Sequence, residues 1–268
     1  MLIKRLLTAV ILIPLVIIAT LKLDSSEFVI AMMPVLVISS WEYSGLIKMK
    51  RWFTKVLYVL GLVTAAYFLN QTPFLLMPLL TITLLWWFIN SFWIISFPKH
   101  TRYWYNHLAT RIVNGFFFFV PLLVALSALH QIDSTLVLLL LVLIWAADSG
   151  AYLVGRAIGK NKLLPNVSPG KTIEGVAGGT LFSLGAMFIY VRFGFENPAF
   201  VQYFFYGVLS LVATLTSILG DLFESLHKRV AGVKDSGILL PGHGGFFDRI
   251  DSLTASAPIF YLTYSFLI

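Results

Sequence analysis

The sequence predicts an all-α, polytopic integral membrane protein with about nine transmembrane helices and a cytoplasmic N-terminus. Hydrophobic residues make up 59% of the 268 residues and charged residues only 12%, whereas soluble domains are about 45–50% apolar and about 25% charged. The apolar residues form runs long enough to cross a bilayer, and the basic residues fall mainly on one side of those runs. The chain has no cysteine, which excludes disulfides and thiolate metal sites.

Each predicted span is a run of roughly 17–25 mainly apolar residues, enough to cross the hydrocarbon core. The first run begins with basic residues, as a signal peptide does, but no small-residue cleavage motif precedes Lys22, so we expect a retained span. Prolines within the runs are expected to kink helices rather than take part in chemistry, because neighbouring helices can satisfy the freed carbonyls. The nine spans are predicted at about 4–22, 27–47, 54–70, 73–97, 111–130, 133–155, 173–193, 200–222 and 252–268.

The basic residues set the orientation. With the N-terminus in the cytoplasm, seventeen of the nineteen Lys and Arg residues lie on the cytoplasmic side, and only Lys22 and Arg192 lie outside. A net charge of +7 could also indicate nucleic-acid binding, but the basic residues are scattered between apolar spans, so no nucleic-acid partner is expected. The expected location is the inner (cytoplasmic) membrane of the cell, with the functional motifs facing the cytoplasm.

The two halves of the chain differ in polarity. Residues 1–110 contain apolar spans with aromatic clusters typical of membrane interfaces, and we interpret them as a scaffold or a dimer contact. Residues 111–268 hold nearly all the polar groups at membrane depth and are predicted to be the catalytic region of one continuous membrane domain.

The stretch from Gly220 to Asp251 is the most unusual part of the chain. It lies between two apolar runs, yet it contains five acidic residues, four Lys or Arg residues and two His residues. Charge at a membrane boundary is costly unless it is paired, solvated or bound to a ligand, so this stretch is a candidate functional site.

Carboxylates lie at both ends of this stretch. Asp221, Glu224 and Lys228 have the spacing i, i+3 and i+7, which places them on one helix face. A surface ladder of ion pairs would have the same spacing, but here the face continues a spanning helix, which favours a pocket. Asp248 and Asp251 open the last span, and carboxylates beside phosphate-binding elements suit Mg²⁺.

The loop between them is rich in glycine. Lys234 and Asp235 precede one glycine, and His243, Gly244 and Gly245 follow. Flexible backbone with exposed amides suits close approach by an anion. We expect His243 to bind phosphate or to shape the loop rather than to hold a metal.

A second polar segment is the short basic loop at residues 160–175. It ends in Ser168, Lys171 and Thr172, and Glu174 opens the next span. Hydroxyls, amides and a lysine at a helix N-terminus can bind phosphate, although the spacing of a P-loop is missing; Lys171 could equally be a positive-inside residue.

Asp148 lies inside the span at 133–155, where a carboxylate costs about 3 kcal/mol. It either lines a water-filled cavity or contacts a polar residue of another helix.

These motifs together resemble a known family. Ser225-x-x-Lys228-Arg229-x4-Lys234-Asp235-x-Gly237-x3-Pro241-x-His243-Gly244-Gly245-x2-Asp248-Arg249-x-Asp251 is similar to the C-terminal signature of phosphatidate cytidylyltransferases. Asp148-Ser149-Gly150-Ala151-Tyr152 and Ser168-Pro169-x-Lys171-Thr172-x-Glu174-Gly175 also resemble that family. There are two departures: His227 replaces a usually apolar residue, and Gly170 replaces a common lysine.

The resemblance implies the reaction of CTP with phosphatidate to give CDP-diacylglycerol and pyrophosphate. It further implies a homodimer and Mg²⁺ dependence, with K⁺ as an optional second ion, and it assigns metal binding to Asp221 and Asp248. Lys228 and Arg249 are the further catalytic candidates. The expected substrate-binding residues are Ser168, Lys171, Thr172, Glu174, Arg229, Lys234, Asp235, His243, Gly244 and Gly245. Asp148, Glu224 and Asp251 are secondary candidates.

Two alternatives remain at this point. A CTP-dependent polyprenol or phytol kinase would share the membrane topology and the nucleotide, and only product analysis separates it from a cytidylyltransferase. A cation transporter could keep Asp148, Asp221 and Asp248 in a cavity, but it would not need the basic His-Gly-Gly loop.

Overall fold

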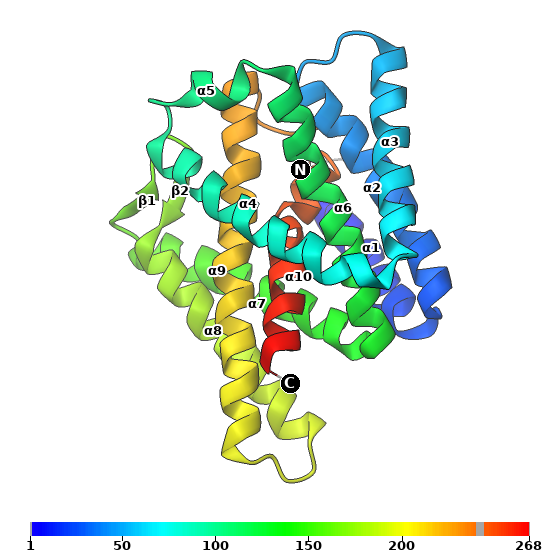
Figure 1. The fold of residues 1–268 in the computed structure, drawn as a ribbon. Coiled ribbons are helices and arrows are strands. Elements are labelled where there is room, and N and C mark those ends of the chain that lie inside the picture. The colour runs from blue at the N-terminus through cyan, green and yellow to red at the C-terminus, as the bar shows by residue number, and fades with distance from the viewer. Residues whose placement is uncertain (1, 240–243, 268) are drawn as a thin grey trace.

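The computed structural model describes residues 2–239 and 244–267, with side chains from residue 10 onward. His243 therefore lies outside the described residues. The described chain is almost entirely helical, as predicted, and its helices pack around one central helix (Figure 1).

A long helix lies at each of the nine predicted positions. Seven of the described helices are long and apolar enough to cross a membrane, namely α2, α3, α4 with the short η1 turn, α6, α7, α8 and α9. The chain is thus an integral membrane protein, and the count of nine spans stays a prediction. The helices are α1 (Leu2–Lys22), α2 (Ser25–Leu46), α3 (Trp52–Asn70), η1 (Pro73–Leu75), α4 (Leu76–Ser96), α5 (Thr101–Tyr105), α6 (Leu108–Ile132), α7 (Ser134–Ile158), α8 (Ile173–Gly194), α9 (Phe200–Ala231) and α10 (Phe247–Leu267).

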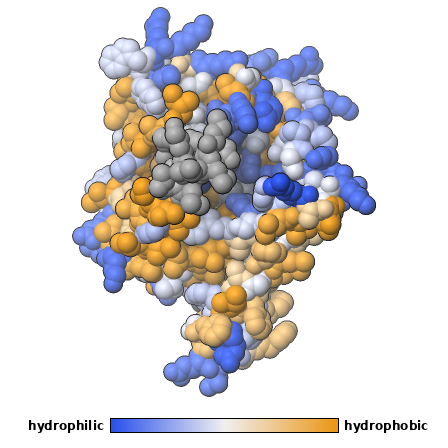
Figure 2. Space-filling model, turned by 180° about the vertical axis from the view of Figure 1, so that it is seen from behind, coloured by the Kyte–Doolittle hydropathy of each residue, from blue (hydrophilic) through white to orange (hydrophobic). Residues whose placement is uncertain are grey.

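The surface agrees with a membrane location. Figure 2 shows hydrophobic residues across the middle of one face of the molecule, with hydrophilic residues along the upper rim and at the lower tip. Large apolar side chains such as Phe88, Phe193 and Phe200 are about four-fifths exposed, and an apolar surface of this kind is stable when it faces lipid.

Helix α10 lies at the centre of the bundle, in contact with α2, α4, α6, α7 and α9 (Figure 1). It is polar at its start, and protein rather than lipid surrounds those polar groups: Asp251, Ser252 and Thr254 are all buried. Gly220 allows the close crossing of α9 over α10, since a Cβ there would overlap the backbone carbonyl of Asp251. This crossing brings the two charged ends of the Gly220–Asp251 stretch together.

Helix α9 continues beyond the predicted end of its apolar span at residue 222 as far as Ala231, so Asp221, Glu224 and Lys228 lie on one helix as expected. Its 32 residues span about 48 Å, whereas the hydrocarbon core is about 30 Å thick. The last turns, which carry Glu224 and Lys228, therefore extend past the apolar part of the helix. Gly232 ends the helix in a left-handed conformation, with φ of +80°, which is favourable only for glycine.

The segment predicted as a loop at residues 160–175 is instead a β-hairpin. Strands β1 (Lys162–Leu164) and β2 (Ser168–Thr172) pair antiparallel, with Lys162 opposite Thr172 and Leu164 opposite Ser168. The strands are too short, and their alternation of polar and apolar residues too weak, for the sequence pattern to reveal them.

Candidate active site

The last turns of α9 supply the first carboxylate. Asp221 is partly exposed; its Oδ1 accepts a hydrogen bond from Ser225 Oγ at 3.2 Å, and its Oδ2 lies 2.7 Å from Lys171 Nζ. The hairpin thus delivers Lys171 to the helix face that carries Asp221. The sequence placed these two residues in separate motifs, and the fold joins them.

The hairpin is held in place by its own neighbours. Arg229 Nε donates a 3.1 Å hydrogen bond to the carbonyl of Val167, which attaches the turn of the hairpin to α9. Thr172 is buried, and its Oγ1 accepts a hydrogen bond from Gly175 N at 3.1 Å, which caps the start of α8. Arg229 and Thr172, both predicted to bind substrate, therefore position the hairpin and its junction with α8 in the described structure.

Asp248 connects three elements at the start of α10. Its Oδ1 lies 2.7 Å from Lys228 Nζ. Its Oδ2 accepts hydrogen bonds from two backbone amides, that of Ser236 at 3.0 Å and that of Gly245 at 2.7 Å. One carboxylate therefore fixes both ends of the glycine-rich loop and ties them to α9.

Lys228 also forms an ion pair with Glu224, one turn earlier on α9. Glu224 is completely buried, so its charge has no solvent to stabilise it. A buried carboxylate of this kind depends on its cationic partner. Glu224, Lys228 and Asp248 consequently form one charged unit beneath the loop.

Asp148 and Asp251 lie near the same place. The charges of Lys171, Asp221 and Arg249 act on Asp148, and those of Asp221, Lys228 and Lys171 act on Asp251. Asp148 is accessible although it lies within a spanning helix, so its side chain lines a cavity, one of the two interpretations that the sequence left open.

Sequence reasoning missed Glu42, which comes from α2 in the half interpreted as scaffold. Its Oε2 accepts hydrogen bonds from Phe247 N at 2.9 Å and from Ser236 Oγ at 3.2 Å. A Cβ on Gly237 or Gly245 would overlap the Glu42 carboxylate, so both glycines are needed for this close approach. Glu42 lies inside a predicted span, where a carboxylate is costly for the same reason as Asp148, so that signal could have identified it.

The remaining predicted residues lie around this centre. Glu174 accepts hydrogen bonds from the backbone and side-chain amides of Asn161, at 3.1 Å and 2.8 Å to its Oε1, and so closes the base of the hairpin. Ser168 is half-buried in β2, and Lys234 and Asp235 are exposed in the loop. Gly244 has a φ of +82°, and a Cβ there would press on Asp235 and Asp248.

His227, one of the two departures from the family pattern, is a packing residue. Its ring is buried among aromatic side chains, with Phe223, Trp104 and Phe118 centroids at 4.6, 5.0 and 5.4 Å. Because the carbonyl of Phe223 can only accept, Nδ1 donates to it, at 2.9 Å, and Nε2 accepts from Asn114 Nδ2 at 3.4 Å. Gly170, the other departure, faces open space.

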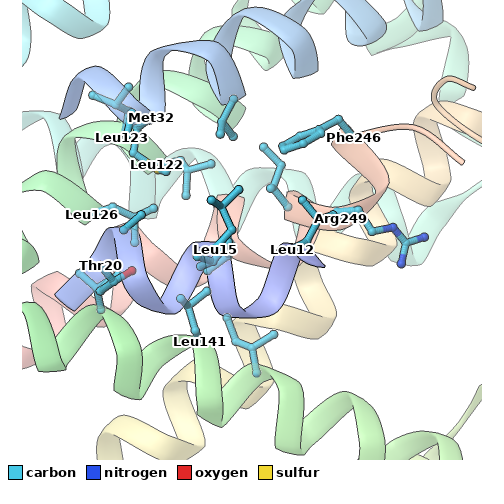
Figure 3. A pocket seen from close by; sticks show the side chains of 18 of the residues that line it. Leu12, Leu15, Thr20, Met32, Leu122, Leu123, Leu126, Leu141, Phe246 and Arg249 are labelled. Carbon is cyan, nitrogen blue, oxygen red and sulfur yellow. The ribbon is translucent and has the colours of Figure 1, made fainter. Parts of the chain in front are cut away.

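An apolar cavity of about 770 Å³ opens beside the charged centre (Figure 3). Its walls come from α1, α2, α6, α7 and α10, and Asp148, Asp248, Arg249 and Asp251 lie along its polar end. An elongated apolar space that ends in charged groups can hold a molecule with an apolar tail and an ionic head.

A metal at this site would have to be shared with a substrate. Among the described residues, no group of three or more His, Asp or Glu side chains is arranged to hold a metal ion alone. Mg²⁺ commonly takes one or two carboxylates and completes its shell with phosphate oxygens and water. Both oxygens of Asp221 are engaged, by Ser225 and Lys171, and both oxygens of Asp248 are engaged, by Lys228 and the loop amides, so each carboxylate would have to release a partner to bind a metal.

The fold and this site define a class: a helical membrane protein that places amines, carboxylates and loop amides, the groups that bind phosphates and cations, beside an apolar cavity. The sequence pattern of the cytidylyltransferase family matches residues 3–267, and the chain belongs to that family. A protein of Haemophilus influenzae named phosphatidate cytidylyltransferase is 36% identical over the full length of both chains. One of the same name from Pseudomonas aeruginosa is 35% identical and covers 97% of this chain and 96% of its own.

Proposed function

We propose that this protein transfers CMP from CTP to phosphatidate, giving CDP-diacylglycerol and pyrophosphate, in phospholipid biosynthesis. The observation that carries this proposal is the position of the charged centre: Asp248, paired with Lys228, lines the polar end of an apolar cavity, and the Lys171–Asp221 pair acts on Asp148 of the same lining. A water-soluble triphosphate and a membrane lipid can meet only at such a boundary. The full-length similarity to proteins named phosphatidate cytidylyltransferase supports the choice of substrates.

In this reaction an oxygen of the lipid phosphate attacks the α-phosphorus of CTP. The new bond joins that oxygen to the α-phosphorus, and the bond from the α-phosphorus to the bridging oxygen breaks as pyrophosphate leaves. The lipid phosphate is already anionic near neutral pH, so no strong base is needed. The main barrier is the approach of two polyanions, which enzymes of phosphoryl transfer lower by positioning and charge neutralisation.

The cationic residues are suited to that task. Lys171 of β2 is paired with Asp221 of α9, Lys228 of α9 is paired with Asp248 of α10, and Arg249 lines the cavity. We assign Lys171 and Lys228 to the phosphates of CTP and Arg249 to the lipid phosphate. The amide of Gly245 already donates to Asp248, so it would have to be released before it could bind the same anions.

A bound Mg²⁺, with K⁺ as an optional second ion, would neutralise developing negative charge on phosphate oxygens. Asp221 is the more exposed of the two predicted ligands; it would have to release Lys171 or Ser225, and Asp248 would have to release Lys228 or a loop amide. Metal binding by this pair is therefore part of the proposal. Chelation by EDTA should abolish turnover, and added Mg²⁺ should restore it.

The orientation and assembly complete the proposal. The charge distribution favours an inner-membrane protein whose site faces the cytoplasm, where CTP is found. Cysteine labelling of the α8–α9 loop and of the hairpin in intact cells would check the orientation, since the two should lie on opposite sides. The homodimer implied by the resemblance is checked by crosslinking in the membrane.

The direct test supplies purified protein with phosphatidate, Mg²⁺ and CTP labelled in its α-phosphate. We expect label in the extracted lipid; label confined to released nucleotide would contradict the proposal. Asp221→Asn should abolish transfer and leave the fold intact, because Asp221 is partly exposed and its removal leaves no buried charge unpaired. A fully active D221N enzyme would refute its role.

A further inference from the structure

The apolar cavity has a defined direction. Figure 3 shows Leu12 and Arg249 near one end, Thr20 near the other, and Leu15 between them. From Leu12 to Thr20 helix α1 advances about 12 Å at 1.5 Å per residue. The cavity is therefore a channel that runs along α1, away from the charged centre and into the membrane-embedded part of the protein.

The far end of this channel is closed by a fixed wall. Thr20 and Phe28 line the cavity there. His130 lies behind both: its Nε2 donates to the carbonyl of Thr20 at 2.9 Å, and its ring stacks on Phe28 with centroids 4.3 Å apart. Its Nδ1 accepts from Ser25 Oγ at 3.1 Å. These contacts connect the α1–α2 turn to α6, so the wall cannot easily retreat.

We propose that this cavity holds one acyl chain of the lipid substrate, with the methyl end of the chain against Thr20 and Phe28. The lipid phosphate then lies at Arg249, beside the charged centre. The α1–α2 turn sets the length of acyl chain that fits completely. This inference rests on the proposed function for the identity of the lipid.

The chemistry of the cavity favours this occupant. Its wall is formed mainly by Leu, Ile, Val, Met and Phe side chains of five helices, and its charged residues are Asp148, Asp248, Arg249 and Asp251. A nucleotide would leave its polar groups unpaired along such a wall. A lipid with one anionic head matches both ends of the space.

The size of the expected effect follows from the solvent that the chain leaves. A lipid tail in a bilayer or micelle is already in apolar surroundings, so entry into the cavity gains only the closer packing of a protein interior. The cavity should therefore change chain-length preference moderately rather than determine binding outright.

The test fills the far end. Ala19 lines the cavity next to Thr20, and Ala19→Phe would place a ring in the space proposed for the last methylenes. The matched control is Leu21→Phe, because Leu21 is 43% exposed and lies outside the cavity wall. We expect the ratio of kcat/KM for dioleoyl to dioctanoyl phosphatidate to fall about tenfold in A19F, or about 1.4 kcal/mol, and to stay unchanged in L21F. An unchanged ratio in A19F overturns the assignment.

A second measurement does not depend on activity or on the folding of a variant. Wild-type protein is irradiated with phosphatidate carrying a diazirine near the methyl end of one chain, and the crosslinked peptides are mapped. Crosslinks in the α1–α2 turn and at Leu122–Leu126 of α6 support the proposal. Crosslinks only at lipid-facing residues such as Phe88, or the same pattern with the corresponding phosphatidylcholine, overturn it.

The two proposals can fail separately. Crosslinking in the cavity without formation of CDP-diacylglycerol would refute the proposed function and leave the lipid site. Formation of CDP-diacylglycerol without crosslinking in the cavity would refute the lipid site alone.

Discussion

Replacement of Glu42 tests whether the first half of the chain takes part in shaping the active site. In Glu42→Ala the amide of Phe247 and the hydroxyl of Ser236 lose their acceptor. Hydrogen bonds to charged groups contribute about 1.5–3 kcal/mol each, so the junction between the loop and α10 loses about 3–6 kcal/mol. Glu42→Gln keeps one carbonyl oxygen, and we expect it to lose about 1 kcal/mol per bond, the difference between charged and neutral acceptors.

The effect on activity follows from the contacts of Asp248. Its Oδ2 is held by the amides of Ser236 and Gly245, and Glu42 fixes the same segment from the other side. A misplacement of about 1 Å in a catalytic group can cost about 100-fold in rate. We therefore expect kcat to fall about 100-fold in E42A and about 30-fold in E42Q, the latter from about 2 kcal/mol for the two bonds.

The assay is CMP transfer from labelled CTP at varied concentrations of both substrates, which separates kcat from KM. Limited proteolysis of the segment from Ser236 to Gly245 reports loop mobility. Glu27→Gln is the matched control, because Glu27 lies on the same helix and its bond, to Asp24 N at 3.0 Å, caps the opposite end. Wild-type kcat and wild-type protease resistance in E42A would refute the reasoning.

Three further predictions follow from the same contacts. Lys228→Met leaves the charge of the buried Glu224 without its partner, which costs about 3–5 kcal/mol of stability, so the thermal midpoint in detergent should fall. Adding Glu224→Leu should restore the midpoint without restoring activity. A double variant with no recovery of the midpoint would contradict the pairing. Gly245→Ala forces a methyl group against the carboxylate of Glu42 and should inactivate the enzyme. Gly170→Ala is the control, because Gly170 faces open space and its replacement should leave activity unchanged. Equal activities of the two variants would contradict the geometry. His227→Phe keeps a ring among the same aromatic side chains but leaves the buried side-chain amide of Asn114 without its acceptor. It should therefore cost about 1–3 kcal/mol of stability and retain turnover. Loss of turnover at an unchanged thermal midpoint would mean that His227 acts in the chemistry.

The sequence was most informative where a pattern is long or rich in charge. Runs of about twenty apolar residues located the nine long helices of the described chain, because a helix that crosses the hydrocarbon core needs a mainly apolar run of that length. The Gly220–Asp251 stretch stood out because charge is costly at that depth. Both signals can be read along the chain itself, so neither requires knowing which residues are in contact in the folded protein.

The sequence failed where the outcome depended on short elements or on partners far along the chain. The strands of the hairpin have three and five residues. So few residues do not show the alternation of polar and apolar side chains that distinguishes a strand from a loop. The helical face of Asp221, Glu224 and Lys228 was expected beyond the apolar span, but the sequence did not show that Lys228 pairs with the buried Glu224. Hydropathy alone treats such charges as the end of an apolar span.

The sequence by itself therefore determined the class of fold, the candidate carboxylates and amines, and the family resemblance, since these follow from composition and local spacing. Only the tertiary structure decided which of them meet. It joined Lys171 to Asp221 and Asp248 to Lys228, added Glu42 from the other half of the chain, and placed the apolar cavity beside them. The physical reason is that ion pairs and cavities arise from side chains on different helices, and their meeting depends on how the helices cross.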